Sequence, residues 1–307
     1  MPGYSSYDVV GKQEDVSDII TNITPTKAPF TSLTKSESVH NTVFQWQEDV
    51  LRAAAPNAQV EGFDATATTR NPTTMRNNVT QIFQDTFQVT GTNDAVSKYG
   101  RGKESAREAA KSSASLKLDL EAAYTQNDAA AVNPGTAGTA RVFAGVQRQI
   151  DAGNIIKTGA TTTVISEAKY LDALQQLYAV GGEPTITLVT PTNSRTFAGF
   201  TGSAGRSRVI NDGSKTIVNA VNLYVSPFGE EKVVLSRYMK TGDTLLFDPA
   251  MWRRVYLQGR NWFRETLAKT GDNMKMMIVG EFLAEAHAPA GFRAGSRKRL
   301  ISTWEAP

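Results

Sequence analysis

VFQWQEDV at residues 43–50 and VTQIFQDTFQVT at residues 79–90 decide how this chain folds. In the first stretch Phe44 and Trp46 alternate with glutamines, and in the second Phe83 and Phe87 do the same. A period of two places apolar side chains on one face and polar side chains on the other, which is typical of half-buried strands. The sequence therefore predicts two strands that enclose a long intervening segment.

The segment between these strands, residues 52–76, has the composition of an arm and not of a domain. It is rich in Ala, Thr, Asn and Pro, and Val60, Phe63 and Met75 are its only large apolar side chains. Hairpin loops usually have about two to five residues, and loops beyond about 12–15 residues are uncommon unless they are functional or disordered. A long segment without a core of its own indicates that it folds against something else, most simply a neighbouring copy.

The composition is that of a globular protein and argues against several function classes. Of the 307 residues 40% are hydrophobic and 21% charged, and the net charge is only +3, which does not favour nucleic acid or a membrane surface as the main partner. The absence of cysteine excludes disulfides, thiolate nucleophiles and Cys-ligated zinc. There is no signal-peptide pattern and no run near the roughly 18 apolar residues of a membrane span, so we expect a soluble protein not exported by the Sec route.

Residues 1–42 are predicted to form an N-terminal arm. A short helix is expected over 15–23, and it ends before Pro25 because the residue preceding a proline avoids the α region. Phe30 and Leu33 then have the character of anchors into an apolar surface. Two interpretations stay open: an arm that lies on a neighbouring copy, or a segment packed on its own domain.

The strongest helix prediction covers residues 103–126, which are rich in Ala, Leu, Lys and Glu and contain no Gly or Pro. Its apolar stripe is shallow, and Glu104 with Arg107, Glu108 with Lys111, and Lys117 with Glu121 have the spacing of helix-surface ion pairs. Residues 127–139 are a low-complexity linker and the expected domain boundary, and 141–150 are predicted as a short helix.

The remainder of the chain is predicted to be mixed at first and then rich in strands. A helix begins at the N-cap Ser166, ends at Gly181-Gly182, and precedes a buried strand at 185–190, which is typical of an α/β unit. Residues 199–211 are predicted as a loop and the end of the chain as a basic tail. Further strands are expected at 218–226, 233–236, 245–247, 252–257, 262–267 and 276–285.

No pattern in the sequence indicates a catalytic, cofactor or metal site. The two histidines, His40 and His287, have no second histidine at metal-ligand spacing and no nucleophile-elbow motif nearby. Neither a phosphate-binding glycine loop nor a dinucleotide-binding motif is present. We expect a non-enzyme, with catalysis by residues that carry no motif as the alternative left open.

Four stretches, taken in order, resemble a known family. These are SDIITNITPTKAPF at 17–30, YGRGKE at 99–104 with LDLE at 118–121, TAR at 139–141 with Ala144-Gly145, and LAKTGD at 267–272 with IVGEFL at 278–283. They are similar to segments of the major capsid proteins of tailed phages related to phage SU-ten. The resemblance runs across most of residues 15–286, is loose over about 150–235 and does not include 288–307.

The resemblance implies an α+β protein with the Hong Kong 97-type capsid fold, in which an arm and an extended two-stranded loop reach over neighbouring subunits. The implied division is an N-terminal arm at 1–42, an extended β-hairpin loop at 43–90 and a spine helix with part of the peripheral domain at 91–134. An axial domain follows at 135–235, and 236–307 hold the β-rich return of the peripheral domain and the tail. Some relatives crosslink covalently through a lysine, but residues 52–76 contain none, so we expect non-covalent closure.

The function implied by the resemblance is that of a major capsid protein of a virion. It would self-assemble as pentamers and hexamers into an icosahedral shell around double-stranded DNA, inside the host cytoplasm. Scaffold, portal and cement proteins would be further partners, the DNA would be contacted non-specifically, and no membrane, cofactor or metal is implied. The candidate assembly contacts are Phe30, Leu33, Val60 and Phe63 as anchors and Arg52, Arg70 and Arg76 as rim partners.

Two other interpretations compete with this one. A bacterial nanocompartment shell would keep the fold and enclose an enzyme cargo. A secreted β-rich enzyme acting on polysaccharide, or an adhesin, is disfavoured by the missing export signal and the lack of aromatic clusters.

Overall fold

The computed structural model describes residues 27–49, 51–52, 54–68, 70–98, 100, 102–134, 136, 138–157, 165–179, 181–200, 223–286 and 299–302. The helix expected over 15–23, most of the loop over 199–211, the start of the strand over 218–226, His287 and most of the basic tail lie outside these residues.

Five α-helices and thirteen strands are described. The helices are α1 (Pro29–Leu33), α2 (Gly91–Ala95), α3 (Glu104–Gln126), α4 (Glu167–Ala179) and α5 (Pro191–Ala198), with short 3-10 turns at Ala152–Asn154 and Pro249–Met251. The strands are β1 (Lys35–Val39), β2 (Val43–Glu48), β3 (Thr74–Val79), β4 (Gln81–Thr90), β5 (Ile155–Lys157), β6 (Ile186–Val189), β7 (Leu223–Ser226), β8 (Gly229–Leu235), β9 (Thr244–Phe247), β10 (Arg253–Leu257), β11 (Phe263–Thr266), β12 (Asn273–Glu285) and β13 (Arg299–Ser302).

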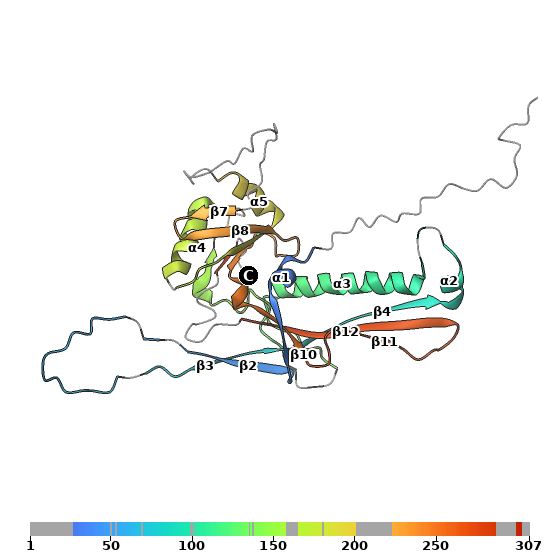
Figure 1. Ribbon diagram of the computed structural model, residues 1–307, viewed down its shortest axis with the longest axis horizontal. Helices are drawn as coiled ribbons and strands as arrows, with labels where there is room; N and C mark the ends of the chain where they lie inside the picture. Colours follow the sequence, from blue (N-terminus) through green and yellow to red (C-terminus); the bar gives the residue numbers. More distant parts are fainter. Residues whose placement is uncertain are drawn as a thin grey trace, which may run out of the picture.

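A long sheet and a long helix form the elongated part of the molecule (Figure 1). β12 is the axis of this sheet: β4 pairs along one edge of it, and β10 and β11 pair one after the other along its other edge. β1 adds to β10 in parallel. α3 runs along β4 and buries Ala109, Leu116 and Leu120, which confirms the helix predicted over 103–126.

A six-stranded sheet forms the second part, in the order β5-β13-β9-β6-β8-β7. β6 is buried along its whole length, as expected for a strand covered on both faces. One face packs against α4 and α5 through a cluster that includes Tyr170, Leu174 and Phe197. The other face joins the core of the elongated part through Leu188 and Phe247, so one apolar core holds the two parts together.

α1 packs where the two parts meet and places Phe30 in their shared core. The Phe30 ring is 1% exposed, and its centroid lies 5.6 Å from that of Tyr124, 5.7 Å from that of Phe247 and 6.0 Å from that of Trp252. The carboxylate of Glu121 in α3 accepts hydrogen bonds from the backbone N–H groups of Phe30 and Thr31, both at 2.7 Å. The Glu121 pair predicted with Lys117 is therefore replaced by a buried contact that holds the start of α1.

Two further predictions differ from the structure. Residues 81–90 form a strand, but β4 pairs with β12, and the partner of β2 is β3. Residues 141–150 form turns and a single bridge between Val142 and Val132, not a helix. The physical reason is that the N–H groups of Gly145 and Val146 donate to the last carbonyls of α3 and its cap, at Asn127 (3.1 Å) and Tyr124 (2.9 Å).

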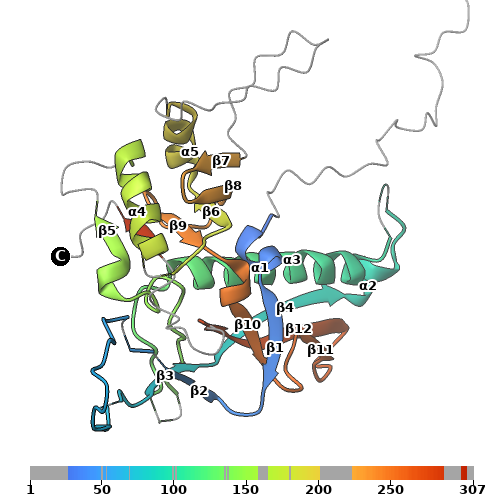
Figure 2. The ribbon, with the colours of Figure 1, turned by 60° about the vertical axis from the view of Figure 1, so that its left-hand side comes forward.

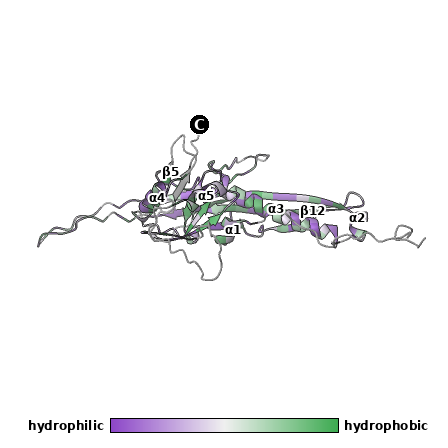
Figure 3. Cartoon of the chain, turned by 90° about the horizontal axis from the view of Figure 1, so that it is seen from above, coloured by the Kyte–Doolittle hydropathy of each residue, from purple (hydrophilic) through white to green (hydrophobic). Residues whose placement is uncertain are grey.

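The described chain is long and thin, with different structures at its two ends. Figure 3 shows it edge-on as a slab. At one end the residues between β2 and β3 project far beyond the sheets, and at the other lie α2 and the turn between β11 and β12 (Figures 1 and 2).

Candidate assembly surface

The projecting segment between β2 and β3, here called the loop (described residues 49, 51–52, 54–68 and 70–73), exposes apolar side chains. Leu51 is 74% exposed, Val60 75% and Phe63 54%. Every residue described from 51 to 73 is exposed, so the loop makes no core of its own. Exposed apolar side chains gathered on one projection are typical of an interaction site.

The tip of the loop (Val60 to Asp64) is a defined turn. The Phe63 N–H donates to the Val60 carbonyl at 3.2 Å, and Gly62 has φ of +80°, a conformation that residues with a Cβ rarely adopt. The turn places Val60 and Phe63 three residues apart with Glu61 between them and Asp64 next to them. The tip is therefore two apolar side chains beside two carboxylates.

The root of the loop is fixed to the rest of the subunit by Arg76. Its guanidinium donates to Glu48 at 2.8 Å and to Asp151 at 2.6 Å, and the Glu48 side chain is 1% exposed. Burial opposes the positive charge, but the hydrogen bond to Asp151 and the charge of Glu48 outweigh it and hold the pKa of Arg76 above its ordinary value. Arg76 thus stiffens the base of the hairpin.

A buried asparagine completes this root. Asn78 is fully buried, and its amide donates to the carbonyls of Ala144 at 3.0 Å and Ala284 at 2.6 Å. Its side-chain oxygen accepts from the Ala144 N–H at 2.9 Å. β3 is therefore bonded to the segment 141–150 through Ala144 and to the end of β12 through Ala284, so the loop projects from a fixed base.

The seven predicted contact residues do not lie together. Val60, Phe63, Arg52 and Arg70 are exposed on the loop. Arg76 pairs within the subunit at the root. Leu33 is half-buried against the subunit's own core, and Phe30 is inside it, which favours the interpretation of residues 27–34 as a segment packed on its own domain. Leu51, which the prediction omitted, shares the exposure of the loop residues.

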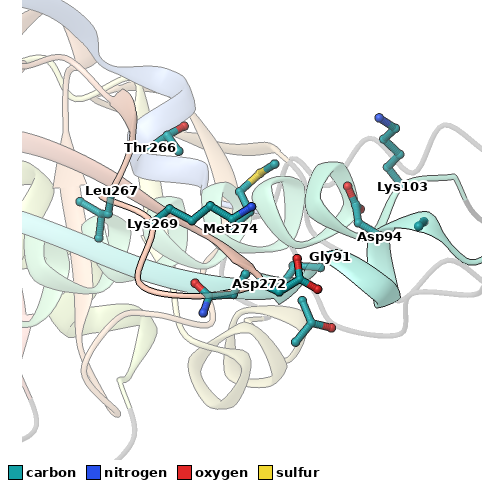
Figure 4. Close-up of a pocket in the computed structure, with 12 residues that line it drawn as sticks. Gly91, Asp94, Lys103, Thr266, Leu267, Lys269, Asp272 and Met274 are labelled. Carbon is teal, nitrogen blue, oxygen red and sulfur yellow. The ribbon is translucent and has the colours of Figure 1, made fainter.

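An open cavity of about 500 Å³ lies at the opposite end of the molecule, and sequence reasoning did not find it. Figure 4 shows its lining: α2 and the start of α3 on one side, and the ends of β11 and β12 with the turn between them on the other. The cavity forms because α2 turns back beside the β11–β12 turn, a contact between residues about 180 positions apart in sequence that no local pattern reveals.

Neither a metal cluster nor a membrane-spanning helix is found in the described ranges. No three His, Cys, Asp or Glu side chains there are placed to hold a metal ion. None of the described helices combines the length and apolar character needed to cross a bilayer. His40 is exposed in the turn between β1 and β2.

Comparisons with known proteins agree on one family. The model of the SU10 major capsid protein family, the SU-ten family named above, matches residues 3–293. The chain is 29% identical over 325 residues to the major capsid protein of Escherichia phage Phieco32, covering 91% of this chain and 92% of that protein.

Solved structures show that the fold is the Hong Kong 97-type capsid fold. The capsid of a native GTA particle matches with a TM-score of 0.66 at 11% identity, covering 96% of each chain. The holo-SrpI encapsulin complex of Synechococcus elongatus PCC 7942 matches with a TM-score of 0.59 at 9% identity, covering 95% of this chain and 92% of that one.

Proposed function

The chain belongs to the SU10 major capsid protein family and is a phage major capsid protein, and on this premise we propose how its surfaces build the shell. Subunits associate as pentamers and hexamers, and these close into an icosahedral shell around double-stranded DNA. Assembly takes place in the host cytoplasm, with scaffold, portal and cement proteins as further partners. The subunit acts by assembly and not by catalysis.

The observation that carries this proposal is the loop. It is anchored at its root by Arg76 and Asn78 and exposes Leu51, Val60 and Phe63 beyond the subunit. Burying one such side chain stabilises a contact by about 1.5–3 kcal/mol. A rigid base with an apolar projection is what a subunit needs to cover a neighbour.

Electrostatic contacts would complete the interface at its edge. Arg52 and Arg70 lie on the two limbs of the loop, where they can meet carboxylates of a neighbouring subunit. Rim charges of this kind set register and association rate more than affinity. Because residues 52–76 contain no lysine, closure from this segment is non-covalent. Obligate assemblies typically bury more than about 2,000 Å² per interface.

A nanocompartment shell with the same fold is the second candidate function. The observation that favours it is the likeness to the holo-SrpI encapsulin complex, which at 9% identity concerns the fold alone. The family match favours the phage capsid. A shell purified from its native source with DNA inside supports the capsid, and one with a single enzyme inside supports the nanocompartment.

The direct test is negative-stain electron microscopy of the chain expressed alone and separated by size. Closed shells, tubes or rings of subunits would establish self-assembly, and the particle diameter would bound the number of subunits. A monomer at all salt and protein concentrations, also after addition of a candidate scaffold protein, would contradict the proposal.

A further inference from the structure

We propose that β13 is a detachable strap: docked between β5 and β9, it closes one edge of the six-stranded sheet and holds the segment that fixes the root of the loop. A subunit with the strap docked assembles, and one with the strap released does not. The inference rests on the proposed function and adds the step that makes a subunit ready for assembly.

The strap lies between two strands that are distant from it in sequence. It pairs in parallel with β5, where Leu300 is opposite Ile155, and antiparallel with β9, where Leu300 is opposite Leu245. Within the described residues no other strand pairs with β5. In this part of the chain, β5 is therefore joined to the six-stranded sheet through β13 (Figure 2).

The rest of the sheet does not depend on the strap. β9, β6, β8 and β7 follow one another without β13, and α4 and α5 pack on these strands. β13 has four residues and β5 three, and the side chains of Ile155 and Ile156 are only partly buried. Elements with few buried apolar contacts open at low free energy. β13 and β5 can therefore separate from the sheet while its four other strands stay paired.

The strand that the strap holds continues directly from the root of the loop. Asp151 precedes the turn Ala152–Asn154, in which the Asn154 N–H donates to the Asp151 carbonyl at 2.8 Å, and Ile155 then begins β5. The Asp151 carboxylate accepts from the guanidinium of Arg76 at 2.6 Å. Because only this short turn separates β5 from Asp151, a docked strap also fixes the carboxylate that holds Arg76.

Backbone groups define what the gap between β5 and β9 accepts. β9 uses one edge for β6 and the other for β13, so release of the strap leaves a row of unpaired N–H and C=O groups. Such an edge takes up an extended segment through main-chain hydrogen bonds. A separate peptide with the sequence of the strap should therefore fill the same gap.

The test places a proline in the strap of the full chain. Ile301→Pro removes a backbone N–H from a strand that pairs on both sides, so the strap should not dock. Ile301→Val is the matched control, because it keeps the backbone donor and a β-branched side chain. Circular dichroism and thermal unfolding establish that both variants are folded.

Hydrogen exchange of the unassembled subunit is the first readout. In Ile301→Pro, exchange in β5 should rise about tenfold or more, because the strap loses a ladder hydrogen bond. Exchange around Arg76 in β3 should rise with it, while β6, β8 and β12 stay unchanged and Ile301→Val matches the native chain. Unchanged exchange in β3 would show that the strap is not coupled to the loop, and loss of the native fold would show that β13 is not detachable. Either result overturns the proposal.

Assembly with a peptide supplied separately is the second readout. By electron microscopy, Ile301→Pro should form at most about a tenth of the shells that the native and Ile301→Val chains form. A large excess of a peptide of residues 297–304 should restore both the shells and the protection of β5, and the same peptide carrying Ile301→Pro should restore neither.

The outcomes separate failure of this inference from failure of the proposed function. Normal shells from Ile301→Pro, or no rescue by the native peptide, overturn the strap and leave the capsid function standing. If the native chain itself forms no shells, the proposed function fails, and the exchange in β3 alone decides whether the strap is coupled to the root of the loop.

Discussion

Phe30 and Phe63 are two phenylalanines in segments of similar composition, yet one is 1% and the other 54% exposed. Around Phe30 the chain supplies Tyr124, Phe247 and Trp252 as neighbours and Glu121 as a hydrogen-bond acceptor. Within the described part of the chain, Phe63 makes no ring contact of this kind and stays largely exposed. This difference supports the proposal that the body of the subunit folds within one chain, whereas the loop needs a neighbouring copy to bury its apolar side chains.

The largest effect should come from truncating Phe30. Phe30→Ala removes a fully buried ring, so we expect the free energy of unfolding to fall by about 3–5 kcal/mol in a chemical denaturation of the unassembled subunit. Phe63→Ala is the matched control and should change that free energy by less than about 0.5 kcal/mol. For assembly the order reverses, with the critical concentration raised about tenfold or more by Phe63→Ala.

Equal destabilisation of the free subunit by Phe63→Ala and Phe30→Ala would contradict this distinction between the two residues. The loop would then have a core within the chain, and its exposure could not be an assembly feature.

Next in size is the loss of the Arg76 contact at the root of the loop. Arg76→Met keeps the length of the side chain but leaves Glu48, 1% exposed at its side chain, without its charge partner. We expect a loss of about 2–3 kcal/mol, somewhat less than for a fully buried pair because Arg76 is only partly buried. Hydrogen exchange should increase in β2 and β3 and stay unchanged in β12.

Arg70→Met is the control for this change, since Arg70 is exposed on the loop. It should leave exchange in β2 and β3 unaltered. Equal exchange in both variants would show that Arg76 does not fix the loop to the body.

An effect of comparable size, on the order of 2–3 kcal/mol, should appear as a pH dependence of the free energy of unfolding that arises in the six-stranded sheet. Glu231 in β8 is fully buried, and burial raises its pKa to about 7, although the Ser226 hydroxyl works in the opposite direction. Besides burial, the negative charge of Glu231 raises the pKa of Tyr170 on α4 and of Tyr224 on β7. A carboxyl with a raised folded-state pKa stabilises fully below its unfolded pKa of about 4.5, and this stabilisation is lost as pH rises through about 7.

The measurement is the free energy of unfolding between pH 5 and 8 for the native chain and for Glu231→Gln. The variant should lose the part of the pH dependence that Glu231 causes. Identical pH profiles would show that Glu231 titrates as it does in the unfolded chain.

Local patterns in the sequence predicted most of the elements but not their partners. α3, α4, β6 and the strands from β9 to β12 lie where propensity and periodicity placed them. β13 was not predicted: Arg299 was assigned to a basic tail, but Arg299–Ser302 pair with β5 and β9. The alternation in 81–90 shows a strand but carries no information on whether β2 or β12 pairs with it. β3 was not predicted because its sequence, TMRNNV at 74–79, is polar. Its Asn78 is buried only because it bonds to carbonyls that are distant in sequence.

The assembly surface could be predicted only in part, because local sequence patterns do not show which distant segments pack together. Val60 and Phe63 were found because their neighbours in sequence cannot bury them. Phe30 and Arg76 have their contacts in segments about 30 to 220 residues away, so their role within the subunit becomes visible only in the fold. The same holds for Leu33, which packs against the core of the subunit. The cavity beside Met274 has no sequence signal, because two turns of the chain create it together.

Shortening the loop is the most direct test of whether shell formation depends on it. Residues 50–72 are replaced by Asn-Gly, a pair that favours a tight hairpin turn and keeps Glu48 paired with Thr74 between β2 and β3. We expect a folded subunit with an unchanged thermal midpoint that forms no shells by electron microscopy under conditions where the native chain does. Normal shells from the shortened chain would contradict the claim that the loop completes the subunit only in an assembly.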